Sequence, residues 1–129
     1  MQRDTDNTLT QQDMIDKSYH RLTAKELVNI LSDTTLTGKY FYNNSWYVFK
    51  VNAFKDGHII GQNSVGTYDR GRWHVNKDDS MTTTWDGTWE DWTGIAYKVE
   101  NEIMFFDSIT KRWKTTYTLV ENGTLSTEI

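Results

Sequence analysis

Apolar and polar side chains alternate along most of the chain beyond residue 34, most clearly in residues 47–53, 95–99 and 113–119. Because neighbouring side chains of a β-strand point to opposite faces, this alternation is typical of strands that bury one face. Clusters of Gly, Asn and Asp interrupt the pattern at roughly ten-residue intervals, which indicates turns. We therefore expect eight strands, near residues 34–43, 45–54, 58–63, 65–75, 80–86, 92–100, 102–107 and 111–120.

The short turns between these segments favour antiparallel pairing of each strand with the next. An open sheet of this kind would leave two unpaired edges, whereas a closed barrel has none. We predict an all-β fold, an antiparallel up-and-down β-barrel of about eight strands with one short N-terminal helix. A two-sheet β-sandwich is the alternative.

The predicted helix has a clear start signal. Thr23 and Glu26 have the spacing of a capping box, in which each side chain accepts a hydrogen bond from the backbone of the other. Leu27, Ile30 and Leu31 follow at helical spacing and share one apolar face. The segment is too short to be stable as an isolated helix, so it must pack on the sheet.

Two positions are open to this helix, which spans residues 22–31. We expect it across one mouth of the barrel, because residues 35–38 begin the first strand too soon for the chain to travel far. The opposite mouth would then be the entrance to any cavity. The alternative is the outer wall, against an apolar strip such as Met104 and Phe106.

The N-terminal segment, residues 1–21, contains few large apolar side chains and no regular period across residues 2–12. We predict a mobile segment there, followed by a single barrel domain over residues 22–129. A short helix within residues 11–21, lying over a barrel mouth, is the other interpretation.

The composition excludes several classes of partner. The 129 residues carry a formal net charge of −4, which argues against binding to nucleic acid. Cysteine is absent, so disulfides and Cys-ligated metals are excluded, and the three His residues lack the spacing of a metal site. No apolar run approaches the roughly 20 residues that span a bilayer. We expect no cofactor, no bound metal and no membrane span.

Three short motifs, Thr35–Gly38, Gly71–Val75 and Met81–Trp85, follow the helix in an order that resembles small bacterial lipocalin-like barrels of the calycin type. The resemblance spans residues 22–120. It implies a periplasmic or secreted protein, exported by a signal peptide that we expect to be absent from this sequence. The resemblance implies no established activity.

The leading functional hypothesis is non-catalytic binding of a small, largely apolar ligand inside the barrel. Eight-stranded barrels are either filled by their own side chains or hold one small ligand. The candidate ligand-binding residues are large side chains that we expect to face inward: Tyr47, Phe49, Trp73, Trp85, Tyr97, Phe105, Trp113 and Tyr117.

A second hypothesis is a scaffold in the cell envelope that binds a protein or glycan partner through exposed Trp residues. Residues 85–92 contain three Trp, and alternation along 68–75 places two Arg and one His on one face. The surface candidates are Arg70, Arg72, His74, Trp89 and Trp92. An enzyme with His74 as base and a neighbouring Arg steadying an anion is the third hypothesis, and we assign no catalytic residue.

Overall fold

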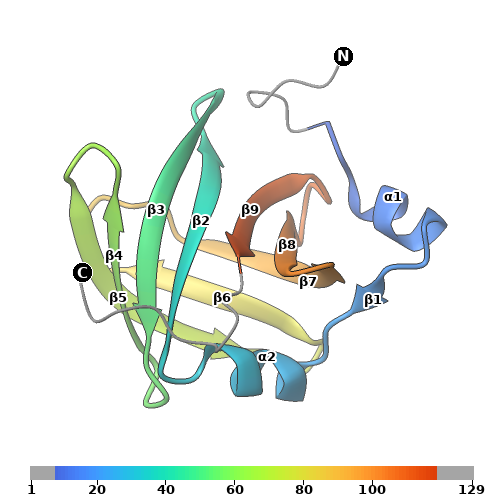
Figure 1. Ribbon diagram of the computed structural model, residues 1–129, viewed down its shortest axis with the longest axis horizontal. Coiled ribbons are helices and arrows are strands. Elements are labelled where there is room, and N and C mark those ends of the chain that lie inside the picture. Colours follow the sequence, from blue (N-terminus) through green and yellow to red (C-terminus); the bar gives the residue numbers. More distant parts are fainter. Residues whose placement is uncertain (1–7, 119–129) are drawn as a thin grey trace.

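The computed structural model describes residues 8–118 and contains the eight predicted strands (Figure 1). A short additional strand and two helices precede them. The helices are α1 (Gln11–Asp16) and α2 (Ala24–Leu31). The strands are β1 (His20–Arg21), β2 (Thr34–Tyr42), β3 (Ser45–Ala53), β4 (His58–Asn63), β5 (Tyr68–Val75), β6 (Ser80–Trp85), β7 (Trp92–Val99), β8 (Glu102–Asp107) and β9 (Trp113–Thr118).

Strands β2 to β9 form a closed antiparallel barrel. Each strand pairs with the next along the chain, and β9 returns to pair with β2 through Thr37–Tyr40. The short strand β1 pairs with β7 at Tyr97 and Lys98, beyond the last residue of β7 that pairs with β6. The predicted up-and-down barrel is confirmed, and the sandwich alternative is not found.

The capping box starts helix α2 as predicted. The Thr23 hydroxyl accepts a hydrogen bond from the Glu26 backbone N–H at 3.2 Å, and a Glu26 carboxylate oxygen accepts the Thr23 N–H at 2.8 Å. A third acceptor, the Asp79 carboxylate, takes the Ala24 N–H at 2.8 Å. The turn between β5 and β6 thus helps to hold the start of the helix.

Helix α2 closes one mouth of the barrel (Figure 1). Leu27 and Leu31 are fully buried, and they belong to the core cluster formed by inward-facing side chains at this end of the strands. That cluster includes Leu36, Val51, Ala53, Ile59, Trp73, Met81 and Ile103. The predicted position across a mouth is confirmed, and we call this the closed end.

Residues 8–21 pack against the barrel and contain a short helix, α1, within the residues 11–21 of the second interpretation, but this helix lies on the outer wall and not over a mouth. Met14 of α1 is 3% exposed and lies against an outer strip of β7 and β8 that contains Ile95, Tyr97, Met104 and Phe106. The Asp13 carboxylate accepts the Thr10 backbone N–H at 2.8 Å and so caps the helix. The apolar strip on the outer wall explains the packing, because it would otherwise face water. Residues 1–7 lie outside the described part of the chain.

The same strip corrects two predicted orientations. Tyr97 faces outward, because Trp92, Gly94 and Ala96 are the inward residues of β7. Trp113 also packs with the outer cluster. In the pairing of β8 with β9 a β-bulge places Lys114 as an extra residue between Trp113 and Thr115, which reverses the alternation at this point.

The position of α2 leads to a stability prediction. We expect Leu27→Ala to lower the free energy of unfolding by about 2–5 kcal/mol, because it empties a fully buried site. Val28→Ala on the same helix, where the side chain is 38% exposed, should change it by less than about 0.5 kcal/mol. Urea unfolding of both variants measures the difference. Equal losses would contradict packing of α2 through its Leu face.

Candidate functional site

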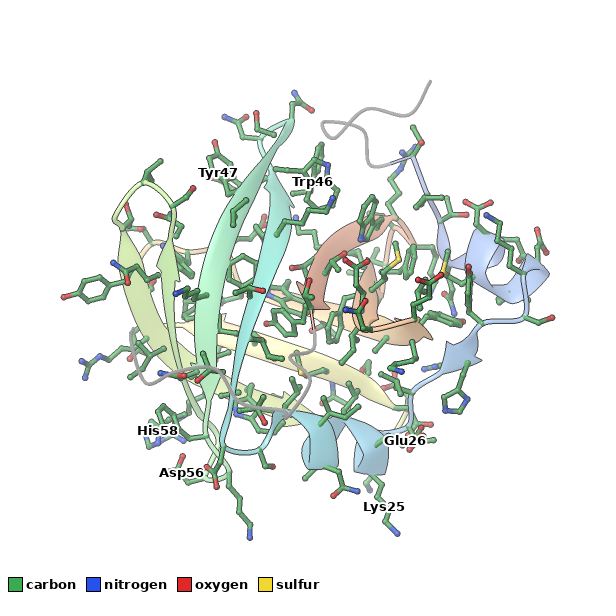
Figure 2. All side chains as sticks on the ribbon, viewed as in Figure 1. Lys25, Glu26, Trp46, Tyr47, Asp56 and His58 are labelled. Carbon is green, nitrogen blue, oxygen red and sulfur yellow. The ribbon has the colours of Figure 1, made fainter. Side chains whose placement is uncertain are left out.

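The end of the barrel opposite α2 is hollow. A cavity of about 360 Å³ opens there, among the last residues of β2, β4 and β6 and the first residues of β3 and β7. Figure 2 shows Tyr47 at this end, far from Lys25 and Glu26 of α2. We call it the open end. Its lining is Tyr40, Tyr42, Tyr47, Phe49, Asn63, Thr67, Trp85, Thr88, Trp89, Glu90, Trp92 and Tyr117.

Aromatic rings form most of the cavity wall. Trp85 and Trp89 contact each other edge to face, with ring centroids 4.8 Å apart. Phe49 and Tyr117 make a second such pair at 5.8 Å. These geometries are the favoured ones for aromatic pairs, so the rings hold one another in fixed orientations. The cavity is therefore built of mutually supported rings.

A glycine makes room for one of these rings. A Cβ placed on Gly61 of β4 would lie 2.6 Å from the six-membered ring of Trp89 and 3.2 Å from Trp85. Any side chain at this position would displace the Trp89 indole from its position over β4. The absence of a side chain at Gly61 thus allows a residue of the β6–β7 loop to reach across the barrel end.

The loop that carries Trp89, residues 86–91, is held by a buried carboxylate. Asp69 faces inward from β5 and is 9% exposed. Its oxygens accept backbone N–H groups from Gly87 at 2.9 Å and from Trp89 at 3.1 Å. Asp91 closes the other side of the loop by accepting the Trp85 N–H at 2.7 Å. The loop is thereby fixed as one wall of the cavity.

A polar cluster lies at the rim. Glu90 receives the Tyr40 hydroxyl as a hydrogen-bond donor, and Lys114 Nζ lies 2.7 Å from the same carboxylate oxygen. Lys114 Nζ also stands 4.9 Å from the centre of the Tyr40 ring. The bulge in β9 accounts for this contact, because it turns Lys114 toward Tyr40 while Trp113 faces outward.

The rim contacts shift two acid–base equilibria. Partial burial alone would raise the pKa of Glu90, but the bonds from Lys114 and Tyr40 outweigh it and lower the pKa below its usual value. Burial is the main cause that raises the pKa of Tyr40, and the hydrogen bond to Glu90 raises it further. Burial alone raises the pKa of Tyr117. Near neutral pH the rim therefore holds the Glu90 carboxylate and a neutral Tyr40 hydroxyl.

The eight candidate ligand-binding residues fall into three groups. Tyr47, Phe49, Trp85 and Tyr117 line the cavity. Trp73 and Phe105 face inward but belong to the packed core. Tyr97 and Trp113 lie outside the barrel, as described above.

The surface candidates also divide. Arg70, Arg72 and His74 are exposed on the outer face of β5, as the alternation predicts. The prediction that Trp92 is exposed is wrong, because it is 7% exposed and packs edge to face on Phe105 at 5.1 Å. Its ring lies over Gly94, which leaves space inside the barrel. Trp89 is half-buried on the cavity wall.

Several lining residues were not candidates in the sequence. Tyr40 and Tyr42 continue the inward alternation of Leu36 and Gly38 in β2, so period 2 alone could have identified them. Asn63, Thr67 and Thr88 lie at strand ends or in loops, where alternation gives no direction. Only the closure of the barrel brings these three together.

The described residues offer no metal site and no membrane helix. Residues 8–118 contain no group of three or more His, Asp or Glu side chains placed to hold a metal ion. Within the same residues, no helix is long and apolar enough to cross a bilayer.

No family model matches this chain, and no curated protein or solved structure matches it. The lipocalin-like relationship therefore stays a prediction.

The contacts of Asp69 can be tested directly. We expect Asp69→Ala to lower the free energy of unfolding by about 1.5–3 kcal/mol, the range for hydrogen bonds to a carboxylate. The amides of Gly87 and Trp89 should lose protection in hydrogen–deuterium exchange. Asp86→Ala, an exposed position of the same loop, is the control and should leave both measurements nearly unchanged. Unaltered protection in Asp69→Ala would contradict this role.

The lowered pKa of Glu90 predicts a pH dependence. Because its folded-state pKa is depressed, the stabilisation is present above the unfolded value of 4.5 and is lost as pH falls through the folded-state pKa. We expect Glu90→Gln to reduce the free energy of unfolding at pH 7 by less than about 1 kcal/mol, since the pair is partly exposed. The difference from the unsubstituted protein should narrow as pH is lowered from 5 to 3.

Urea unfolding across this pH range provides the measurement. In a Lys114→Gln background the pH-dependent part of the difference should shrink, because the ion pair is already absent. A difference that stays constant or grows on acidification would show that Glu90 is not stabilised as its contacts indicate.

Proposed function

We propose that this protein binds a small, largely apolar molecule, without catalysis, in the open end of its barrel. The main support for this proposal is that the interior is packed in the half under α2 and hollow in the other half, where aromatic rings surround a cavity of about 360 Å³. A barrel needing only stability would gain from filling this space, because buried voids lose packing contacts.

The size and lining of the cavity support a small ligand. Typical small-molecule sites measure roughly 300–1,000 Å³ and combine apolar walls with few polar groups. This cavity lies near the lower limit, and eight of its lining residues are aromatic. The polar lining residues lie at strand ends and in loops of the open end, where they can orient a bound molecule. They are Asn63, Thr67, Thr88 and Glu90.

Because α2 covers the closed end, a ligand would enter the barrel through the open end. Leu27 and Leu31 of α2 are fully buried against inward-facing residues, so a ligand would have to displace the helix to enter there. At the open end, the β2–β3 hairpin and the β6–β7 loop surround the cavity instead. An exported, lipocalin-like barrel would use its interior in this way, and that origin is part of the proposal.

The two alternative functions gain less support. The scaffold hypothesis relies on exposed Trp residues, but Trp92 is buried in the core and Trp89 forms part of the cavity wall. Of the surface candidates, this leaves Arg70, Arg72 and His74 exposed on the outer face. In the enzyme hypothesis His74 acts as a base, but it faces away from the cavity on the outer side of β5. Neither alternative uses the hollow interior.

A fluorescent apolar probe tests the proposal. Titration with N-phenyl-1-naphthylamine, which is neutral, should raise its emission saturably in the unsubstituted protein. Thr88→Trp should weaken the increase, because Thr88 lines the cavity from the β6–β7 loop and an indole there narrows the entrance. Thr84→Trp is the matched control on the outer face of β6 and should leave the titration unchanged.

Circular dichroism should confirm that both variants keep the β-rich fold. No saturable increase with the unsubstituted protein would refute ligand binding in the barrel. Equal losses in Thr88→Trp and Thr84→Trp would place the probe elsewhere than in the cavity.

A further inference from the structure

The charged group in the cavity lining is negative. Among the residues of 8–118 that line the cavity, Glu90 is the only charged one, and none is Lys, Arg or His. Arg112 and Lys114 line a neighbouring hollow of about 520 Å³, which shares Glu90 and Tyr42 with the cavity. An anionic ligand in the cavity would thus meet a carboxylate and find no cation of the lining to pair with.

The carboxylates around the cavity strengthen this asymmetry. Asp86 and Asp91 belong to the loop that forms one wall, and Asp69 lies beneath it with both oxygens directed at its backbone. Lys114 is the cation in contact with Glu90. Among the charged side chains of this loop and those in contact with it, the carboxylates of Asp69, Asp86, Glu90 and Asp91 outnumber the ammonium group of Lys114, and a site with low-dielectric walls focuses such a field.

The aromatic wall favours cations in the same way. The face of each ring carries partial negative charge, and a cation within about 6 Å of a ring centre is attracted to it. Recognition of quaternary ammonium groups by sets of aromatic rings is a known use of this interaction. Within the described part of the chain, eight aromatic residues line this cavity, four of them Tyr and three Trp.

The protein already places an ammonium group in this arrangement. Lys114 Nζ stands 4.9 Å from the centre of the Tyr40 ring and 2.7 Å from Glu90. The rim therefore combines the ring face and the carboxylate that an organic ammonium ion requires. Tyr40 and Glu90 both line the cavity, whereas Lys114 reaches them from the neighbouring hollow.

We propose that the cavity selects organic cations, namely amines or quaternary ammonium ions with a small aromatic or alkyl body. The inference rests on the proposed function, because it specifies the ligand class of the same cavity. The body of the ligand lies among the rings, and its cationic group lies near Glu90 and Tyr40. Lys114 competes with the ligand for Glu90 and so weakens its binding.

Three probes of similar shape and different charge test the selectivity. They are phenyltrimethylammonium, tert-butylbenzene and benzenesulfonate, each used to displace bound N-phenyl-1-naphthylamine. We expect the cation to bind about ten-fold more tightly than the neutral compound, an effect between those of exposed and of desolvated cation–π contacts. The anion should bind most weakly of the three.

Two substitutions should move the selectivity in opposite directions. Glu90→Gln should weaken phenyltrimethylammonium binding by about ten-fold, leave tert-butylbenzene within about two-fold, and strengthen benzenesulfonate binding because Lys114 loses its partner. Lys114→Gln should strengthen binding of the cation, since Glu90 is then free of its competitor. Glu102→Gln, at the start of β8 beside the closed end, is the charge-matched control and should change none of the three affinities.

The outcomes separate this inference from the proposed function. If the naphthylamine binds but all three probes displace it equally, or the anion displaces it best, the charge selectivity is refuted and ligand binding stands. If the naphthylamine does not bind at all, both proposals fail. If Glu90→Gln is unfolded by circular dichroism, Lys114→Gln still decides, because weaker or unchanged binding of the cation would overturn the inference.

Discussion

Closure of the β-sheet is the constraint on which the rest of this structure depends. Pairing of β9 with β2 removes the sheet edges and creates an interior with two ends. Each end exposes inward-facing side chains that must be covered by another element or left accessible. Helix α2 covers one end with Leu27 and Leu31, and the aromatic residues of the strand ends surround the other.

The outer wall of the barrel shows the same need for cover. Strands β7 and β8 carry apolar residues on both faces, so they require a partner outside the barrel as well as the core inside. Met14 of α1 and the contacts around it provide that partner. The segment before the barrel is thus part of the folded unit from residue 8 onward, and β1 extends the pairing of β7.

The open end is organised by polar contacts instead of by a hydrophobic cover. Asp69 holds the β6–β7 loop from below through backbone N–H groups, and Glu90 joins this loop to β2 and β9 through Tyr40 and Lys114. Such contacts fix the position of Trp89 without filling the space beside it. The same groups that keep the mouth in shape also determine the charge that a bound molecule would meet.

The sequence by itself determined the eight strands of the barrel, their order and the start of α2, because period 2, turn residues and a capping box are local features. It could not determine which face of a strand points inward where both faces are apolar, and Tyr97 of β7 was misplaced for that reason. Nor could it locate the bulge that turns Trp113 outward and Lys114 toward Tyr40. Alternation identified Tyr47, Phe49, Trp85 and Tyr117 of the cavity lining, because they lie within strands. The hollow itself and its lining from loops and strand ends were decided by tertiary structure, because only closure of the barrel brings those residues together.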